Sequence, residues 1–289
     1  MPRTRRADDA GGLYHALNRG NFRSQIFWND DDYSAFEQIL VEGLERFEVS
    51  VFSFQLMPDH WHLVLRPYVD GEMSRFLRWV TSTHTMRYHA RYHTSGEGHV
   101  YQGRYKSFPI QDDEHFLTVC RYVERNSLQA EFVSRAEEWR WGSLWRWMQK
   151  PKPNPALLSP WPIPRPRGWV ERVNQPLSEQ ELSAVRSCIQ RGAPFGDLAW
   201  VESTVKQFGL QSPCDPENDH ASEISPRSTE TSPKPFDFHR KRHTWENNND
   251  CIHDDCDMPE IDVLRQNTPN YRDSAPFCGA SDLRICSNR

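Results

Sequence analysis

The stretch that most restricts the fold is "VSVFSFQLMPDHWHLVLRP", residues 49–67. Apolar and β-branched residues alternate with polar ones on both sides of the dipeptide Pro58–Asp59. Such alternation is typical of a half-buried strand, and a tight turn between two such runs predicts an antiparallel hairpin. Because a sheet buries its apolar side against another layer, the rest of the chain has to supply helices that cover it.

The order of the other expected elements predicts the fold class. Residues 29–48 read as a helix, with an Asn/Asp N-cap followed by apolar residues at helical spacing: Tyr33, Phe36, Ile39, Leu40 and Leu44. The remaining expected elements are strands at 12–20, 49–58, 60–67 and 103–111 and helices at 71–93 and 112–126. This order, β-α-β-β-α-β-α, favours an α+β, ferredoxin-like split βαβ fold: an antiparallel sheet with helices on one face, plus one added helix.

Composition divides the chain into four parts. We expect residues 1–148 to form the main domain. The segment 149–168 is proline-rich, which predicts an extended linker because proline interrupts helices and central strands. Residues 169–210 return to a helical pattern, with caps at Ser178 and Asp197, and predict a small helical hairpin. From 211 to 289 the chain is polar and reads as a disordered tail.

Charge is distributed unevenly along the sequence. The net charge is −5, but residues 211–289 hold 9 Lys and Arg against 15 Asp and Glu, which leaves 26 against 25 in residues 1–210. The acidic excess therefore lies in the tail, whereas the front of the chain has basic clusters such as Arg104 with Lys106. These clusters permit contacts with phosphates, although scattered basic residues are also usual on a solvated surface.

Cysteine usage and hydropathy indicate a cytoplasmic protein. Seven cysteines are an odd number in a long chain, which favours a reducing compartment. The basic N-terminus lacks the apolar segment of a secretory signal, and no apolar run is long enough to span a bilayer, so we expect no membrane partner. The tail motif "CIHDDC" (251–256), with Cys278 and Cys286, fits no common zinc-finger spacing, and incidental cysteines are the favoured interpretation.

Two histidines stand out in the second strand of the hairpin. His60 and His62 are two positions apart, so their side chains share one face of the strand, whereas Trp61 and Leu63 share the other. Their Cα atoms would be about 7 Å apart, close enough for both rings to bind one divalent cation. The alternative is a pair of exposed or hydrogen-bonded histidines without a ligand.

The last expected helix of the main domain offers two further candidates. Tyr122 and Asn126 are four residues apart and so share a helix face. The Asn126 amide oxygen could complete a metal site with the two histidines, a donor set that suits Mg²⁺ or Mn²⁺, and the Tyr122 hydroxyl would then face the substrate. The alternatives are a core aromatic residue for Tyr122 and a helix C-cap for Asn126.

These motifs carry a resemblance to a known family. "MPDHWHLVL" followed by "RYVERN" resembles the HUH superfamily of single-tyrosine transposases, and most closely its REP-associated tyrosine transposases. "YHALNRGNFRSQIF" and, in the extension, "SPWPIPRP" and "RGAPFGDLAWV" are also similar to that family, so the resemblance spans roughly residues 10–210. It implies a metal-dependent DNA transposase with Tyr122 as nucleophile, His60 and His62 as metal ligands and Asn126 as third ligand.

The resemblance also implies the reaction and its partners. Tyr122 would form a 5′-phosphotyrosine link with single-stranded or hairpin DNA from repetitive palindromic elements, in a nucleoid-associated monomer or homodimer. Candidate phosphate contacts are Arg19, Arg104 and Lys106, for which a solvated surface is the alternative. Two other functions stay open: a catalytically silent regulator that binds hairpins, and a metal-dependent hydrolase that uses water.

One segment departs from the family pattern. Members usually follow the asparagine with proline, a basic residue and glycine, whereas this chain continues "NSLQAEF" with Ser127, Gln129 and Glu131. We expect this change to loosen the end of the tyrosine helix, which would put full activity in doubt.

Overall fold

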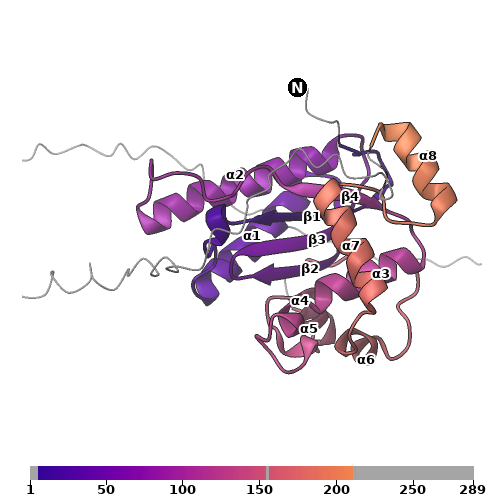
Figure 1. The fold of residues 1–289 in the computed structure, drawn as a ribbon. Helices are drawn as coiled ribbons and strands as arrows, with labels where there is room; N and C mark the ends of the chain where they lie inside the picture. The colour runs from indigo at the N-terminus through magenta and orange to yellow at the C-terminus, as the bar shows by residue number, and fades with distance from the viewer. Residues whose placement is uncertain (1–5, 154–155, 211, 213–289) are drawn as a thin grey trace, which may run out of the picture. The chain divides into compact units, whose positions relative to one another are not determined.

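The main domain is built on a four-stranded sheet. The computed structural model describes residues 6–153, 156–210 and 212. The strands are β1 (Leu13–Arg19), β2 (Val49–Met57), β3 (His60–Pro67) and β4 (Lys106–Ile110), arranged in the order β2-β3-β1-β4 with every pair antiparallel (Figure 1). This order confirms the ferredoxin-like fold. Apart from Ser212, the predicted tail and its cysteines lie outside the described residues.

Two long helices cover one face of the sheet. Helix α1 (Asp30–Arg46) begins at Asn29, whose side chain accepts hydrogen bonds from the backbone N–H groups of Asp31 and Asp32 in a capping box. Helix α2 (Glu72–Tyr92) packs beside it. The buried residues between these helices and the sheet include Ala16, Phe36, Phe54, Trp61, Leu63, Phe76 and Val80. Trp61 and Leu63 therefore point into this core, as the strand alternation predicts.

The opposite face of the sheet carries the tyrosine helix and the helical extension. Helix α3 (Glu114–Glu124) begins at Asp113, as expected, and packs on β2 and β3. Helices α6 (Trp169–Asn174) and α7 (Glu179–Arg191) pack against α3 (Figure 1). All three helices share one buried cluster with the sheet, which includes Leu13, Val64, Phe108, Phe116, Cys120, Trp169, Val173 and Cys188. The extension is thus part of the core on this face.

The proline-rich segment is irregular but not detached. Its described residues form no helix or strand. It nevertheless runs along β2, where Ser159 N donates to Val51 O at 2.8 Å and Trp161 Nε1 donates to Phe52 O at 2.8 Å. These bonds use backbone groups that an edge strand would otherwise leave open to pairing with another chain.

The two expected helices of the extension exist but do not form a hairpin. Helix α7 has the Ser178–Glu181 capping box, and α8 (Leu198–Phe208) is capped by Asp197, as predicted. Helix α7 packs on α3 and β4 (Figure 1). Phe208, near the end of α8, contacts the core under α1 and α2. The hairpin prediction is wrong because the two helices contact different parts of the main domain. Elements without a prediction include α5 (Ser143–Met148) and the 3-10 turns Asn21–Arg23 and Ala136–Glu138.

The end of the tyrosine helix differs from expectation in two respects. Helix α3 ends at Glu124, and a separate turn, α4 (Asn126–Gln129), follows after Arg125. Arg125 is the C-cap, and Asn126 O accepts the N–H of Ala130 at 3.0 Å, so the interpretation of Asn126 as a C-cap is wrong. Nor is this end loosened, because the buried Ser127 accepts a hydrogen bond from Gln55 Nε2 of β2 at 2.8 Å.

Candidate functional site

A polar cavity of about 840 Å³ lies where β1, β3 and β4 meet α3, α4 and α7. It contains all seven residues proposed from the sequence: Arg19, His60, His62, Arg104, Lys106, Tyr122 and Asn126. The other residues that line it are Leu17, Asn18, Arg23, Gln102, Gly103, Gln129, Ala130, Arg186, Ile189 and Gln190. Strand pairing brings β1 and β3 together here, since Arg19 stands opposite His60 and Leu17 opposite His62.

Both histidines are held through their Nδ1 atoms. The two rings lie with their centroids 5.0 Å apart, and both side chains are buried. His60 Nδ1 contacts Asp59 Oδ1 at 2.5 Å, and His62 Nδ1 contacts His15 Nε2 at 2.9 Å. In metal sites, a ligand histidine usually has its second ring nitrogen fixed by such a partner. The contacts therefore leave Nε2 of each ring for a ligand in the cavity.

Asn126 lies next to the second of these nitrogens. Its amide Nδ2 is 3.4 Å from His62 Nε2, and rotation of the amide by 180° would put its oxygen in that place. In the described part of the chain, no group of three or more His, Cys, Asp and Glu residues could hold a metal ion. The donors that could hold Mg²⁺ or Mn²⁺ here are the Nε2 atoms of His60 and His62 and the amide oxygen of Asn126. The other coordination positions would be open to substrate or water.

Tyr122 projects from α3 beside the histidines. Its ring stands edge-on to His62 at a centroid distance of 5.9 Å and to His15 at 6.5 Å. Burial raises the pKa of the Tyr122 hydroxyl above its ordinary value of 10.0, while the charges of Arg186 and Arg19 act to lower it. The hydroxyl is therefore protonated at neutral pH and needs help to act as a nucleophile.

Burial also keeps His15 and His62 neutral. It lowers the pKa of His15 to about 3 from 6.5. It lowers the pKa of His62 well below 6.5, with smaller contributions from the charges of His60, His15 and Arg19. A neutral imidazole has one nitrogen lone pair, and only in that form can it bind a metal ion.

The cavity is strongly positive. Five of its lining residues are basic: Arg19, Arg23, Arg104, Lys106 and Arg186. Among the described residues that line it, none is an aspartate or a glutamate. Asp59, 3.7 Å from the Arg19 guanidinium, lies just outside the lining. A concave surface with this charge attracts a polyanion.

The sequence reasoning missed three contributors to this site. His15 could have been noticed as a polar residue in the apolar strand "LYHAL", two positions from Leu17 on the same face. Asp59 forms the turn before β3, and its contact with His60 Nδ1 was not expected from the sequence. No sequence signal pointed to Arg186. This residue reaches the site because α7 packs on α3. Arg186, Ile189 and Gln190 lie on one face of α7 and line the cavity together.

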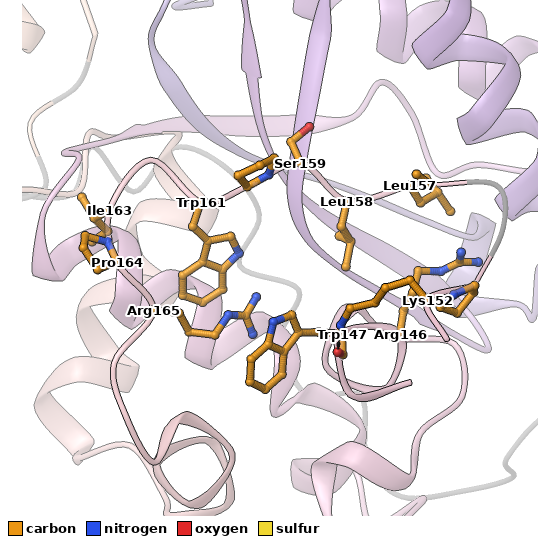
Figure 2. Close-up of a pocket in the computed structure, with 13 residues that line it drawn as sticks. Arg146, Trp147, Lys152, Leu157, Leu158, Ser159, Trp161, Ile163, Pro164 and Arg165 are labelled. Atoms are coloured by element: carbon orange, nitrogen blue, oxygen red, sulfur yellow. Dashed lines mark hydrogen bonds between the residues drawn. The ribbon is translucent and has the colours of Figure 1, made fainter. Parts of the chain in front are cut away.

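A second, apolar cavity of about 430 Å³ lies between the proline-rich segment and α5 (Figure 2). The Arg165 guanidinium lies between two indole rings there, 3.7 Å from the Trp161 centroid and 4.3 Å from that of Trp147. Stacking of this kind fixes the segment against the domain. This cavity shares no lining residue with the histidine site.

Comparisons with known proteins find similarity to transposases in the main domain. Residues 11–126 match the family model described as "Transposase IS200 like". A REP-associated tyrosine transposase bound to a REP hairpin is similar in structure, with a TM-score of 0.43 and 19% identity over 50% of this chain and 84% of that one. A protein from Deinococcus radiodurans R1 assigned as a transposase has a TM-score of 0.32 and 18% identity over 46% of this chain and 95% of that one.

No match is found among curated proteins. Neither structural likeness reaches a TM-score of 0.5, so the assignment depends on the family model, which ends at Asn126 and includes both histidines and Tyr122. In the described part of the chain, no helix is long and apolar enough to cross a membrane. The family model thus confirms, for residues 11–126, the resemblance to transposases that the motifs led us to expect.

Proposed function

We propose that this transposase domain cuts and rejoins one DNA strand at a time, with Tyr122 as the nucleophile. The observation that carries the proposal is the content of a single cavity. A tyrosine hydroxyl, two histidines whose Nδ1 atoms are held by Asp59 and His15, and an asparagine amide face a space that is lined by five basic residues and, within the described chain, by no carboxylate. A phosphodiester is the substrate that such a combination suits.

His60, His62 and Asn126 would hold a divalent cation. Held by the two Nε2 atoms and the amide oxygen, Mg²⁺ or Mn²⁺ would act as a Lewis acid on the scissile phosphate. The residues fit this role because Asp59 and His15 already occupy the two Nδ1 atoms. Burial of both rings keeps them in place before any ion arrives.

The covalent step is a transesterification. Tyr122 Oη attacks the phosphorus, the bond from phosphorus to the 3′ oxygen breaks, and a 5′-phosphotyrosine and a free 3′ hydroxyl result. The phenol proton is transferred in net terms to the departing 3′ oxygen. Arg19 and Arg186 offset part of the burial effect on the pKa of Tyr122 and would stabilise the phenolate as it forms. Since one ester replaces another, the same step run backwards joins strands.

The shape of the site favours a single strand or the unpaired end of a hairpin. The cavity that holds Tyr122 is lined by Arg19, Arg104 and Lys106 from the side of the sheet and by Arg186 from α7. We propose these four side chains as phosphate contacts. Base pairs next to the scissile phosphate would compete for the space that α7 takes, whereas a hairpin stem can stay outside.

The same lining weighs against a hydrolase. A hydrolase that uses water needs a general base beside the metal, and carboxylates usually fill that role. None of the described lining residues is a carboxylate. Tyr122 is therefore the better nucleophile. A silent DNA-binding regulator would use the same charges without the chemistry and is distinguished by experiment.

The test is a denaturing gel of protein incubated with Mn²⁺ and labelled single-stranded, hairpin or duplex DNA. The full chain should form a covalent adduct with single-stranded or hairpin DNA that keeps a 3′-end label and releases a 5′-end label. Tyr122→Phe retains the packed ring and should bind the DNA but form no adduct. Tyr68→Phe, at an exposed tyrosine on the far edge of the sheet, should behave like the wild type.

Three results would contradict the proposal. Binding without an adduct in the wild type would indicate the regulator. Cleavage that survives Tyr122→Phe would indicate a water nucleophile. Retention of the 5′-end label would mean that the opposite ester bond breaks.

A further inference from the structure

His15 is an imidazole in an otherwise apolar environment. It lies in the middle of β1 with none of its surface exposed, and its ring packs on Phe108 at a centroid distance of 4.9 Å. Nδ1 of this ring has no hydrogen-bonding partner among the described residues. A buried polar atom without a partner costs about 1–3 kcal/mol. An apolar residue of similar size would avoid this cost.

The polar contact that the structure gives His15 is the one to His62. His15 Nε2 lies 2.9 Å from His62 Nδ1, and the centroids of the two rings are 5.1 Å apart. The strand register explains the contact: His15 pairs with Val64, so His62 is its diagonal neighbour on the same sheet face. His15 itself does not line the cavity. Any influence on the reaction must therefore pass through His62.

We propose that His15 is a positioning residue that selects the metal-binding tautomer of His62. This inference rests on the metal site of the proposed function. A neutral imidazole carries one N–H, so a single proton is shared across the contact between the two rings. When His62 Nδ1–H donates to His15 Nε2, the lone pair of His62 is on Nε2 and faces the cavity. The hydrogen of His15 then lies on its partnerless Nδ1.

The reverse arrangement closes the site. If His15 Nε2–H donates to His62 Nδ1, then His62 carries its hydrogen on Nε2 and can donate it to the amide oxygen of Asn126, 3.4 Å from that nitrogen in the flipped amide orientation. In this state neither His62 nor Asn126 is free to bind a cation. Binding of the ion and the tautomers of His15 and His62 are thus coupled.

His60 has a different partner for the same purpose. Its Nδ1 contacts the Asp59 carboxylate. An ionised carboxylate can accept a hydrogen bond but cannot donate one, so the hydrogen of this contact lies on His60 Nδ1. His60 is thereby fixed in its metal-binding tautomer, whereas His62 depends on an imidazole that can donate or accept.

Two variants of His15 and a matched control test the inference in the full chain without DNA. His15→Phe removes the acceptor and should weaken Mn²⁺ binding roughly 10- to 100-fold, the usual effect of losing an outer partner of a metal ligand. His15→Gln keeps an acceptor oxygen and should recover part of that loss. His84→Phe removes another buried histidine, bonded to Tyr101 in the opposite core, and should leave Mn²⁺ binding unchanged.

Titration calorimetry at pH 7.5 measures the affinity, and thermal melting confirms that each variant is folded. A second measurement needs no variant: two-bond ¹H–¹⁵N correlation on histidine-labelled wild type reports the tautomer. His62 should carry its hydrogen on Nδ1 when Mg²⁺ is bound.

The outcomes separate this inference from the proposed function. If the wild type binds Mn²⁺ and His15→Phe binds it equally well, or if the Mg²⁺-bound wild type has the hydrogen of His62 on Nε2, the role of His15 is refuted and the metal site stands. If the wild type binds no Mn²⁺, or binds it as well after His60→Ala combined with His62→Ala, the metal site and the inference both fail.

Discussion

Replacing Glu124 with alanine should destabilise the fold more than any change at the surface. Glu124, two residues after Tyr122 in α3, is completely buried. Its carboxylate accepts hydrogen bonds from Ser143 Oγ at 2.7 Å, Trp169 Nε1 at 2.7 Å and Ser53 Oγ at 3.4 Å. The Arg165 guanidinium lies 4.0 Å away. Glu124 therefore joins the tyrosine helix to β2, α5, the proline-rich segment and α6.

The magnitude follows from these contacts. Loss of one partner of a buried ion pair costs about 3–5 kcal/mol, and Glu124→Ala removes the carboxylate from Arg165 and from three donors at once. In a domain of this size each kcal/mol shifts the melting temperature by about 2–4 °C, so a drop of about 6–20 °C is expected. Glu124→Gln keeps the volume but turns an N–H₂ group toward Trp169 Nε1, and should cost about 1–3 kcal/mol.

The pH dependence gives a second check. Burial raises the pKa of Glu124 above 4.5, against the lowering effects of Arg165, Trp169, Ser143 and Ser53. A raised pKa means that the folded state holds its proton after the unfolded state has lost it, so wild-type stability falls as the pH rises above 4.5. The glutamine variant cannot show this fall. The stability difference between wild type and Glu124→Gln should therefore narrow as the pH rises.

Thermal melting followed by circular dichroism at several pH values measures both effects. Glu45→Ala, at an exposed glutamate of α1, is the matched control and should change stability by less than about 0.5 kcal/mol. The reasoning is refuted if Glu124→Ala melts with the control, or if the difference between Glu124→Gln and wild type does not change with pH.

Three further changes test other parts of the molecule. Ser127→Ala leaves the buried Gln55 Nε2 without its partner at 2.8 Å and should lower the free energy of unfolding in urea by about 1–3 kcal/mol. The same loss in a Gln55→Leu background would contradict the contact. Arg186→Ala should weaken binding of single-stranded DNA and reduce the slope of log affinity against log salt by about 1. The control Arg78→Ala, at an exposed residue of α2, should change neither quantity. If the salt slope of Arg186→Ala equals that of the wild type, Arg186 does not contact the DNA. Burial lowers the pKa of His84 to about 3 from 6.5. Below pH 6.5 the histidine is protonated in the unfolded state but not in the folded state, so the stability of the fold decreases as the pH falls. His84→Gln should remove about 2 kcal/mol of that loss between pH 7.5 and pH 5, and an unchanged acid dependence in urea unfolding would exclude His84 as its source.

Features with a short-range cause could be predicted from the sequence. Alternation with period two placed Trp61 and Leu63 in one core and His60 and His62 on the opposite face. The caps at Asn29, Ser178 and Asp197 depend on a side chain bonding to backbone only two or three residues ahead, and all three are present. Helical spacing likewise brought Tyr122 and Asn126 to the same cavity, although the chain changes from α3 to α4 between them.

Features that depend on contacts between distant segments were decided by the tertiary structure. His15 meets His62 because β1 pairs with β3 in one particular register, and a shift of one residue would turn His15 to the other face of the sheet. Arg186 enters the site because Val185 and Cys188 of α7 are buried, which turns the adjoining side of that helix toward the cavity. Similarly, α7 and α8 follow one another in the sequence yet pack on different parts of the domain. Local periodicity gives the face that an element buries, but the partner of that face depends on apolar surfaces elsewhere in the chain.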